Sequence, residues 1–468
     1  MPPHKSPLAI LVVLAALFAL IMLAVGCAAP PPAPSPEVIE KVVTQVVTVE
    51  VPKEVQVEVT REVVVTPPSP AELAAQYMPD SLHGTTRGMG YFYSKEQGGF
   101  ETLTGIPYEE LPCQNCHTKY NKGEKAGQTR CEACHIADPE RFAPPQASVR
   151  MPQYAESGNS GCLSCHRRQG FEYTKTTVRL DAEGKPVLDP ETGVEIQVPA
   201  ITDVHRSPAP AGKSLACVNC HDTVSTHGDG NVYNNLFDSP NTECTDCHAA
   251  DKLSANPGHQ AHGENMTCAA CHAQTVVSCQ GCHLNAVIAG APEFPNQRVF
   301  GWKFLVKNNE GKIDLGNMMT AMYVDDAGDL KTIAVLSPYY DHSIGKPKDI
   351  NALCAQCHDN PNVKAYNETG AIVISQWDEA AGKMVYPTKG VVPVPPDYQT
   401  AFKIVFPIIS NVEEVAQAAK DGMPAAEVEK LAKWIFGEDA PDMWQMNYAT
   451  PLDKMPPQMQ FSFPTPTP

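Results

Sequence analysis

The 468-residue sequence has few aromatic residues and little positive charge. Phe, Trp and Tyr make up 7% of the chain, with only 4 Trp, so side chains for a large aromatic core are scarce. Lys and Arg number 35 against 53 Asp and Glu, and the formal net charge is −18. This sign disfavours nucleic acid as a partner, because phosphate binding needs a basic surface. No segment repeats beyond one pentapeptide, which excludes a solenoid of identical units.

Cysteine, in contrast, is abundant and regularly placed. Of 17 cysteines, 16 fall into eight copies of the pattern Cys-x-x-Cys-His, and only Cys27 lies in another context. The paired cysteines are Cys113 and Cys116, Cys131 and Cys134, Cys162 and Cys165, Cys217 and Cys220, Cys244 and Cys247, Cys268 and Cys271, Cys279 and Cys282, and Cys354 and Cys357. The histidines that follow them are His117, His135, His166, His221, His248, His272, His283 and His358.

Cys-x-x-Cys-His is the attachment signature of c-type haem. Two thiols at this spacing can form thioethers with the two vinyl groups of one porphyrin edge, and the following histidine becomes the proximal ligand of the iron. Zinc knuckles share Cys-x-x-Cys but do not require a histidine after each pair. With eight copies, the chain resembles a multihaem cytochrome c that carries eight haem c groups. Only six residues separate the motifs 268–272 and 279–283, which predicts that their porphyrins are close neighbours.

Six histidines remain as candidates for the distal face of the irons, once the motif histidines and His4 are set aside. An isolated histidine is ordinarily a surface residue, but these are scarce and most lie close to attachment motifs. We predict as distal metal ligands His83, His205, His227, His259, His262 and His342. Six histidines for eight haems leave at least two irons with another ligand. Methionine is the first substitute, and Met89, Met151 and Met266 lie near the motifs.

The N-terminus predicts export and anchoring. Residues 8–25 are uninterruptedly apolar behind Lys5 and end at "LAVGCAAP", which resembles a bacterial lipobox. We therefore expect a signal peptide over 1–26 and lipidation of Cys27, with an uncleaved membrane anchor as the alternative. Because haem c is attached outside the cytoplasm, the expected location is the outer side of the cytoplasmic membrane, the periplasm or the cell surface.

The residues after the lipobox favour a simple domain plan. Residues 27–71 are rich in Pro and Val and are expected to form an extended tether, although their alternating pattern also suits a strand that pairs with a partner or with itself. Residues 72–365 hold all eight motifs, which leaves fewer than about 40 residues for each haem. We therefore expect the porphyrins to supply the core of an octahaem cytochrome c domain.

The predicted fold is mostly irregular, with short helices around the haem sites and a few β-hairpins. Strands are expected within 174–200, 296–338 and 370–395, where Gly, Pro, Asn and Asp mark the turns. Residues 366–468 form a C-terminal extension that packs on the haem domain. It contains a predicted helical hairpin over 411–437, with Asn411 as the first cap and Gly422 at the first end.

Electron transfer outside the cytoplasm is the function that the resemblance implies. Redox partner proteins or extracellular electron acceptors are the expected partners, and the acidic charge suits a basic docking face. The number of haems is similar to that of octahaem enzymes related to hydroxylamine oxidoreductase and of octahaem nitrite and tetrathionate reductases. Those enzymes keep one haem open or ligated by lysine. A terminal oxidoreductase and a subunit of a haem filament therefore remain as alternatives, and the oligomeric state is not predicted.

Overall fold

The computed structural model describes residues 68–111, 166, 176–178, 185–188, 195, 197–199, 201–207, 213, 215–249, 257–288, 296–347, 349–423, 425–460 and 463. Contacts divide the chain into two units, Met1–Ser69 and Pro70–Pro468. The predicted signal peptide, Cys27 and the tether as far as residue 67 lie outside the described residues. Within the described part, no helix has the length and apolar character of a membrane span.

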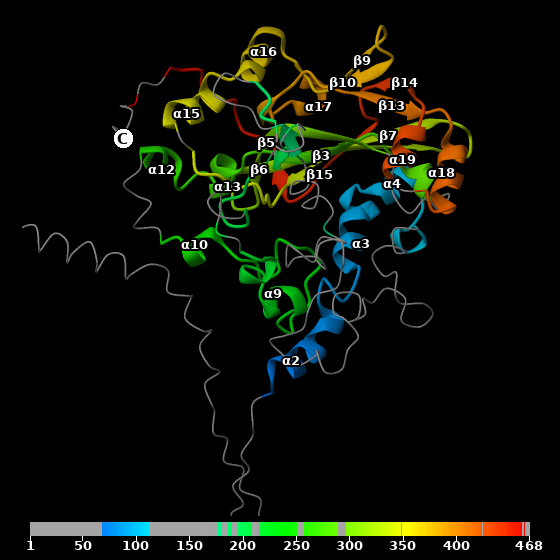
Figure 1. Cartoon of the computed structure of the whole chain (residues 1–468). Coiled ribbons are helices and arrows are strands. Elements are labelled where there is room, and N and C mark those ends of the chain that lie inside the picture. Colours follow the sequence, from blue (N-terminus) through cyan, green and yellow to red (C-terminus); the bar gives the residue numbers. More distant parts are fainter. Residues whose placement is uncertain are drawn as a thin grey trace, which may run out of the picture. The chain divides into compact units, whose positions relative to one another are not determined.

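The second unit contains an eight-stranded sheet (Figure 1). Three long antiparallel strands form its centre: β5 (Gln297–Asn308), β6 (Ile313–Val324) and β7 (Leu330–Pro338). Two shorter strands lie parallel at its margins, β11 (Gly390–Pro393) beside β5 and β15 (Met443–Met446) beside β7. The sheet is completed by β3 (Val276–Gln280) and β16 (Ala449–Thr450), which pair with β5, and by β4 (Cys282–His283), which pairs with β6.

Tight turns join the three long strands because the sequence supplies Asx residues and glycine at each reversal. Asn308 Oδ1 accepts two backbone amide protons of its turn, at 3.0 and 3.1 Å. Asp325 Oδ1 does the same in the next turn, at 3.0 and 2.9 Å. Gly311 and Gly328 adopt φ of 78° and 86°, a region that L side chains disfavour. The strands predicted within 296–338 are therefore confirmed.

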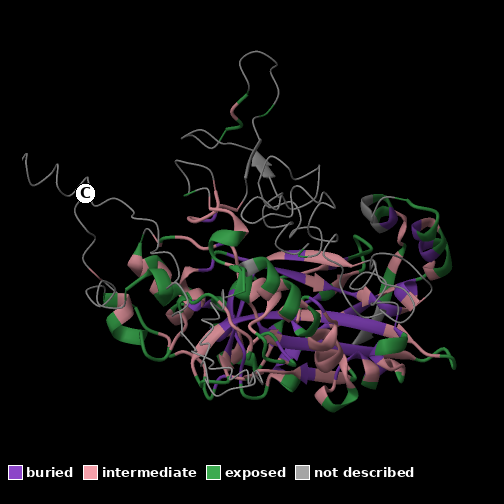
Figure 2. Ribbon diagram, turned by 90° about the horizontal axis from the view of Figure 1, so that it is seen from below, coloured by how far each residue is buried: buried purple, intermediate pink, exposed green. Residues whose placement is uncertain are grey.

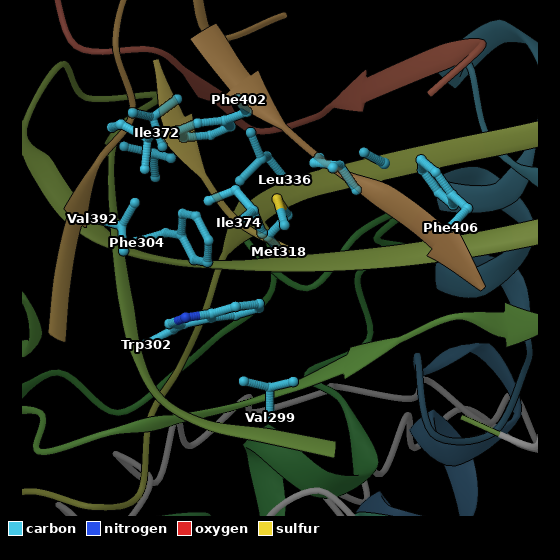
Figure 3. Close-up of a cluster of buried hydrophobic side chains, with 14 of the residues drawn as sticks. Val299, Trp302, Phe304, Met318, Leu336, Ile372, Ile374, Val392, Phe402 and Phe406 are labelled. Atoms are coloured by element: carbon cyan, nitrogen blue, oxygen red, sulfur yellow. The ribbon is translucent and has the colours of Figure 1, made fainter. Parts of the chain in front are cut away.

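One face of the sheet forms the largest hydrophobic core (Figure 3). Its side chains alternate along each strand, as a period of two residues requires. Trp302 is fully buried, and its indole nitrogen donates to the carbonyl oxygen of Thr388 at 2.7 Å. The sheet residues of this core are Val299, Trp302, Phe304, Val306, Met318, Met322, Ala334, Leu336 and Val392.

Residues 361–409 cover this face, above the sheet in Figure 1. They contribute the buried side chains of Ile372, Ile374, Phe402 and Phe406. The covering elements are α16 (Pro361–Thr369), β8 (Ile372–Val373), β9 (Gln376–Asp378), β10 (Lys383–Val385), α17 (Tyr398–Ala401), β12 (Phe402–Lys403) and β13 (Val405–Ile409). They form a β9–β10 hairpin and a parallel β8–β12 pair.

Short helices cover the opposite face, where Figure 2 shows the buried strands behind more exposed segments. Phe100 of α4 and Leu284 of α14 pack against Ile333 and Val335 of β7. The helices before residue 361 in the described part of the chain are α2 (Pro70–Tyr77), α3 (Arg87–Tyr93), α4 (Phe100–Thr104), α9 (Thr223–His227), α10 (Cys244–Cys247), α12 (Pro257–His262), α13 (Cys268–His272), α14 (Leu284–Ile288) and α15 (Ile350–His358). Single 3₁₀ turns are η1 (Met78–Asp80), η2 (Lys95–Gln97), η3 (Tyr108–Glu110) and η6 (Cys217–Asn219), and β1 (Thr176–Val178) pairs with β2 (Gln197–Pro199).

The C-terminal helical hairpin is present but shorter than predicted. Helix α18 (Val412–Lys420) is followed by Gly422 at φ 85° and by α19 (Ala425–Leu431). The predicted cap is wrong, because Asn411 makes no cap hydrogen bond. Its side chain instead donates to the carbonyl oxygen of Leu431 at 3.0 Å and accepts from the amide of Lys433 at 2.8 Å.

Residues 434–437 are not helical, in contrast to the prediction. They belong to β14 (Trp434–Asp439), which pairs antiparallel with β13. Aromatic and β-branched residues at Trp434, Ile435 and Phe436 favour a strand once a partner edge is available. Sequence periodicity within the segment does not reveal that edge.

The prediction of a mostly irregular fold needs correction. Short helices around the motifs and hairpins within 174–200 and 370–395 are present, but the described residues combine them with a multistranded sheet. The expectation that porphyrins supply the core is wrong for this sheet, because protein side chains alone form a buried core on it. Residues after 366 contribute β11, β15 and β16 to the same sheet as β5. Four buried aromatic side chains, Trp302, Phe304, Phe402 and Phe406, are enough for this core, so a low aromatic content did not exclude a core built from protein.

The protein-built core predicts the cost of truncating Phe304. This side chain is 0% exposed, and Phe304→Ala should lower the free energy of unfolding by about 3–5 kcal/mol because a cavity remains. Val373→Ala, at a side chain on the covering segment that is 38% exposed, serves as the control and should cost well under about 1 kcal/mol. Urea unfolding of the complete protein measures both. Equal stabilities of the two variants would contradict a protein-built core.

Candidate functional site

Five of the eight Cys-x-x-Cys-His motifs lie in the described part of the chain. Four sit on short helical segments, namely 217–221 on η6, 244–248 on α10, 268–272 on α13 and 354–358 at the end of α15. A helical turn brings the first cysteine and the closing histidine, four residues later, to the same side. Motif 279–283 instead runs across β3 and β4. Motifs 113–117 and 131–135, with Cys162 and Cys165, lie outside the described residues.

Motif histidines face histidines from elsewhere in the chain. In five cases, one motif imidazole lies opposite one of the six additional histidines. Their ring centroids are 6.0 to 6.2 Å apart, whereas the angle between ring planes varies from 14° to 61°. The five imidazole pairs are His83 with His166, His205 with His248, His342 with His221, His259 with His272, and His262 with His358.

This constant spacing fits two imidazoles on opposite sides of one metal ion. A bond from a metal to an imidazole nitrogen is about 2 Å long, so the two nitrogens lie about 4 Å apart and the ring centroids about 6 Å apart. Direct ring stacking would constrain the angle between the planes, which here varies widely. The residues present therefore fit a six-coordinate iron between each pair, as in a haem with two histidine ligands.

Helix α12 supplies the second imidazole of two different pairs. His259 lies opposite His272 of the nearby motif, whereas His262 lies opposite His358, far along the chain. The two histidines are three positions apart in the sequence, so both project from neighbouring positions of one short helix. The sites at 268–272 and 354–358 are thus neighbours that share α12, at one end of the sheet in Figure 1.

Backbone carbonyls orient several of these rings. The Nδ1–H of His272 donates to the carbonyl oxygen of Gly345 at 3.1 Å, and that of His358 donates to Pro457 at 2.8 Å. The same contact joins His227 Nδ1 to the carbonyl oxygen of Thr223 at 3.1 Å. A hydrogen bond at Nδ1 fixes the tautomer and leaves Nε2 to bind a metal. His227 therefore has Nε2 available to bind a metal, although it belongs to none of the five imidazole pairs.

A buried carboxylate orients His205. Asp203 is 4% exposed, and its Oδ1 lies 3.5 Å from Nδ1 of His205. Its other oxygen accepts the amide proton of Ile344 at 2.8 Å, next to His342. Burial alone would raise the pKa of Asp203, but the hydrogen bonds from His205 and the backbone lower it. The hydrogen bond with Asp203 in turn raises the pKa of His205. One carboxylate thus holds the loops of two imidazole pairs.

Desolvation by surrounding protein atoms favours the neutral form of two additional histidines, although the His83 side chain itself is exposed at the surface and that of His342 is half-buried. Desolvation is the main cause that lowers the pKa of His83 to about 4, and neighbouring His166, His227 and His221 lower it further. Desolvation and His221 likewise lower the pKa of His342 to about 4. The neutral form is the one that binds a metal. The influence of His221 on His83 also places the His83–His166 pair beside the His221–His342 pair.

Cysteines of different motifs are also neighbours. In three cases a thiol of one motif raises the pKa of a thiol in another. Burial is the larger cause in two cases, and a thiol–thiol hydrogen bond is the larger cause in the third. The affected thiols are Cys220 beside Cys247, Cys357 beside Cys271, and Cys244, which is hydrogen-bonded to Cys268. The five imidazole pairs therefore form a row, from His166 through His221, His248 and His272 to His358.

His283 differs from the other described motif histidines. It is 0% exposed and lies on a strand, and neither ring nitrogen has a hydrogen-bond partner among the described residues. Burial lowers its pKa to about 4. Leaving two buried imidazole nitrogens without a partner is costly, about 1–3 kcal/mol for each group, which fits a residue that binds a metal. The described residues place no second imidazole opposite it.

Two of the three methionines predicted as substitute ligands lie in the described part of the chain. Met266 packs against a small hydrophobic cluster that consists of Ala270, Leu305, Val391 and Leu452. Met89 belongs to α3, and Met151 lies outside the described residues. The sequence analysis also missed the groups that orient the imidazoles, namely Asp203 and several backbone carbonyls. Of these, only Asp203 could have been found from the sequence, because it lies two residues before His205.

Because Asp203 is hydrogen-bonded to the loop of His205 and to the loop of His342, its replacement should destabilise the protein. Asp203→Asn removes charged hydrogen bonds to Ile344 and to the loop of His205, and should lower the free energy of unfolding by about 2–3 kcal/mol. The matched control is Asp222→Asn, because Asp222 caps α9 through Ser225 and asparagine caps a helix equally well. Chemical unfolding of both variants measures the difference. A loss no larger than in the control would show that Asp203 does not support the site.

Comparison with known proteins adds little to this geometry. No protein-family model matches the chain. No curated protein matches it either. Among solved structures, it is similar to the crystal structure of octaheme cytochrome c from Shewanella oneidensis, with 13% identity, over 56% of this chain and 74% of that chain. The TM-score is 0.23, a value at which the likeness supports no conclusion about fold or function, so the assignment rests on the residues of the site.

Proposed function

We propose that the chain is an exported electron-transfer protein with eight covalently attached haem c groups. The five imidazole pairs are the observation that supports this most strongly, because each contains the histidine of a Cys-x-x-Cys-His motif at the spacing of two axial ligands. A bound haem supplies one-electron exchange at its iron.

In this proposal, the chain's own residues fix and shield each iron. The two cysteines of a motif hold the porphyrin edge through thioethers, and the motif histidine binds one face. His83, His205, His342, His259 and His262 bind the opposite face of their respective irons. Two protein ligands leave no position for a substrate at these five sites. Such sites suit reversible electron transfer better than catalysis on a bound molecule.

The row of imidazole pairs supports conduction along the chain. Cysteines of different motifs approach one another at three places, so the attachment edges of neighbouring haems are close. At each of the five sites, two thioethers and two histidine ligands would hold the haem in place, so few other protein contacts are needed. Electrons would enter and leave by way of redox partner proteins or extracellular acceptors. The net charge of −18 favours a partner with a basic docking face and disfavours nucleic acid.

Export and anchoring belong to the same proposal. The attachment motifs require haem loading outside the cytoplasm, and the "AVGC" sequence supports lipidation of Cys27 after cleavage of residues 1–26. We place the protein on the outer side of the cytoplasmic membrane, in the periplasm or at the cell surface.

A terminal oxidoreductase is the second candidate, and His283 favours it. This motif histidine has no imidazole opposite it within the described residues, so its iron would have a different sixth ligand or none. An open iron would bind a small nitrogen or sulfur compound. A high-spin ferric band in the wild-type protein would favour this candidate, whereas fully low-spin haem favours electron transfer.

Haem stoichiometry tests the proposal first. The intact exported protein should carry eight haems, as measured by its mass and by pyridine haemochrome absorbance. Replacing Cys354 and Cys357 together with serine should leave seven, because both thioethers of one haem are lost. Zinc in place of haem, or a count unaffected by the double replacement, would sink the proposal.

Axial ligation is tested at His342. The variant His342→Ala should open one iron, so one haem in eight becomes high-spin and binds carbon monoxide when reduced. His342→Met is the control, because a thioether sulfur can keep the iron six-coordinate and low-spin. Electronic absorption and magnetic circular dichroism distinguish the states. An unchanged low-spin spectrum and unchanged carbon monoxide binding in His342→Ala would exclude His342 as a ligand.

A further inference from the structure

A buried lysine joins two of the attachment motifs. Lys303 lies on β5 and is 5% exposed. Its Nζ donates to the carbonyl oxygen of Ala273 at 3.1 Å and to Oε1 of Gln356 at 2.8 Å. Ala273 directly follows His272, and Gln356 lies between Cys354 and Cys357. One ammonium group therefore contacts both the 268–272 and the 354–358 segments.

Both acceptors of this ammonium are uncharged. The ion pairs found among the described residues do not include Lys303. Burial lowers its pKa, and the groups that raise it are Cys357, Cys271 and, last, Asp341. A cysteine that forms a thioether can no longer ionise, which leaves Asp341 as the acidic group of this set. A buried ammonium with little compensation is costly, so its presence between two motifs calls for a physical reason.

The two motifs that Lys303 contacts also share their second imidazoles. His259 and His262 of α12 face His272 and His358. The same two sites are thus joined by α12 through the additional histidines and by Lys303 through the attachment segments. Among the described motifs, only these two are joined both by one helix and by one lysine.

We infer that the Lys303 ammonium raises the reduction potentials of the two haems attached at 268–272 and 354–358, an inference that rests on the proposed function. A fixed positive charge favours the ferrous over the ferric state, because the additional electron lowers the charge of the iron by one. The effect is large at a buried position, where water does not screen the charge. Lys303 is a tuning residue and not an iron ligand, since its ammonium hydrogen-bonds to Ala273 and Gln356.

Lys303→Met in the complete haem-loaded protein tests the inference, because methionine has similar length and no charge. Lys307→Met is the matched control. Lys307 lies on the same strand and the same face, and it pairs with Asp453 at 2.8 Å near the surface. Spectroscopically monitored redox titration should show two haem components of Lys303→Met shifted to lower potential. A tenfold change in the reduction equilibrium corresponds to a shift of 59 mV for one electron. The control should show no such shift.

A second variant covers the case in which Lys303→Met folds poorly. Lys303→Gln is also neutral but retains a donor for the carbonyl oxygen of Ala273, and it should give the same downward shift. Unchanged potentials in a neutral variant that still carries eight haems would overturn the inference and leave the proposed function intact. A wild-type protein without haem at these motifs would instead refute the proposed function itself.

Discussion

The structure depends on one geometric constraint, which is that two imidazoles from different segments must face each other about 6 Å apart between ring centroids. No single helix or turn can satisfy this constraint, because residues close in sequence project side by side and not toward one another. His221 and His342 meet across a long stretch of chain, as do His262 and His358. Each pair therefore needs a rigid support that fixes both segments.

The central sheet provides this support. The motif at 268–272 begins beside β6, where the amide of Thr267 donates to Ile313 at 2.9 Å and its hydroxyl donates to Asp314. The segment after β7 carries His342, and its residue Ser343 donates through Oγ to the carbonyl oxygen of Thr275 at 3.0 Å. The register of the strands thus determines the positions of the motif segment and of the segment that carries an additional histidine. The protein-built core on the other face keeps that register fixed whether or not a cofactor is bound.

The described sites are not equivalent, and their differences have electrostatic meaning. Asp203 places a negative charge beside His205, whereas Lys303 places a positive charge between the motifs 268–272 and 354–358. His283 is enclosed by the sheet and has no second imidazole among the described residues. A carboxylate beside a ligand and an ammonium beside a haem shift potentials in opposite directions. Under the proposed function, these particular side chains would give the row of sites unequal potentials.

The sequence by itself determined which side chains are available for cofactor chemistry and part of the local structure. Eight copies of one motif predicted the attachment residues, elimination left six further histidines as candidate ligands, and Asx–Gly turns marked the strands of 296–338, because all of these depend on neighbours in the chain. The pairing of His262 with His358, the burial of His283 and the contact of Lys303 with Gln356 were decided only by the tertiary structure. The physical reason is that these contacts depend on the relative positions of β3, β5 and α15. The sheet fixes these positions with strands from distant parts of the chain, so the spacing of residues within a short segment does not predict them.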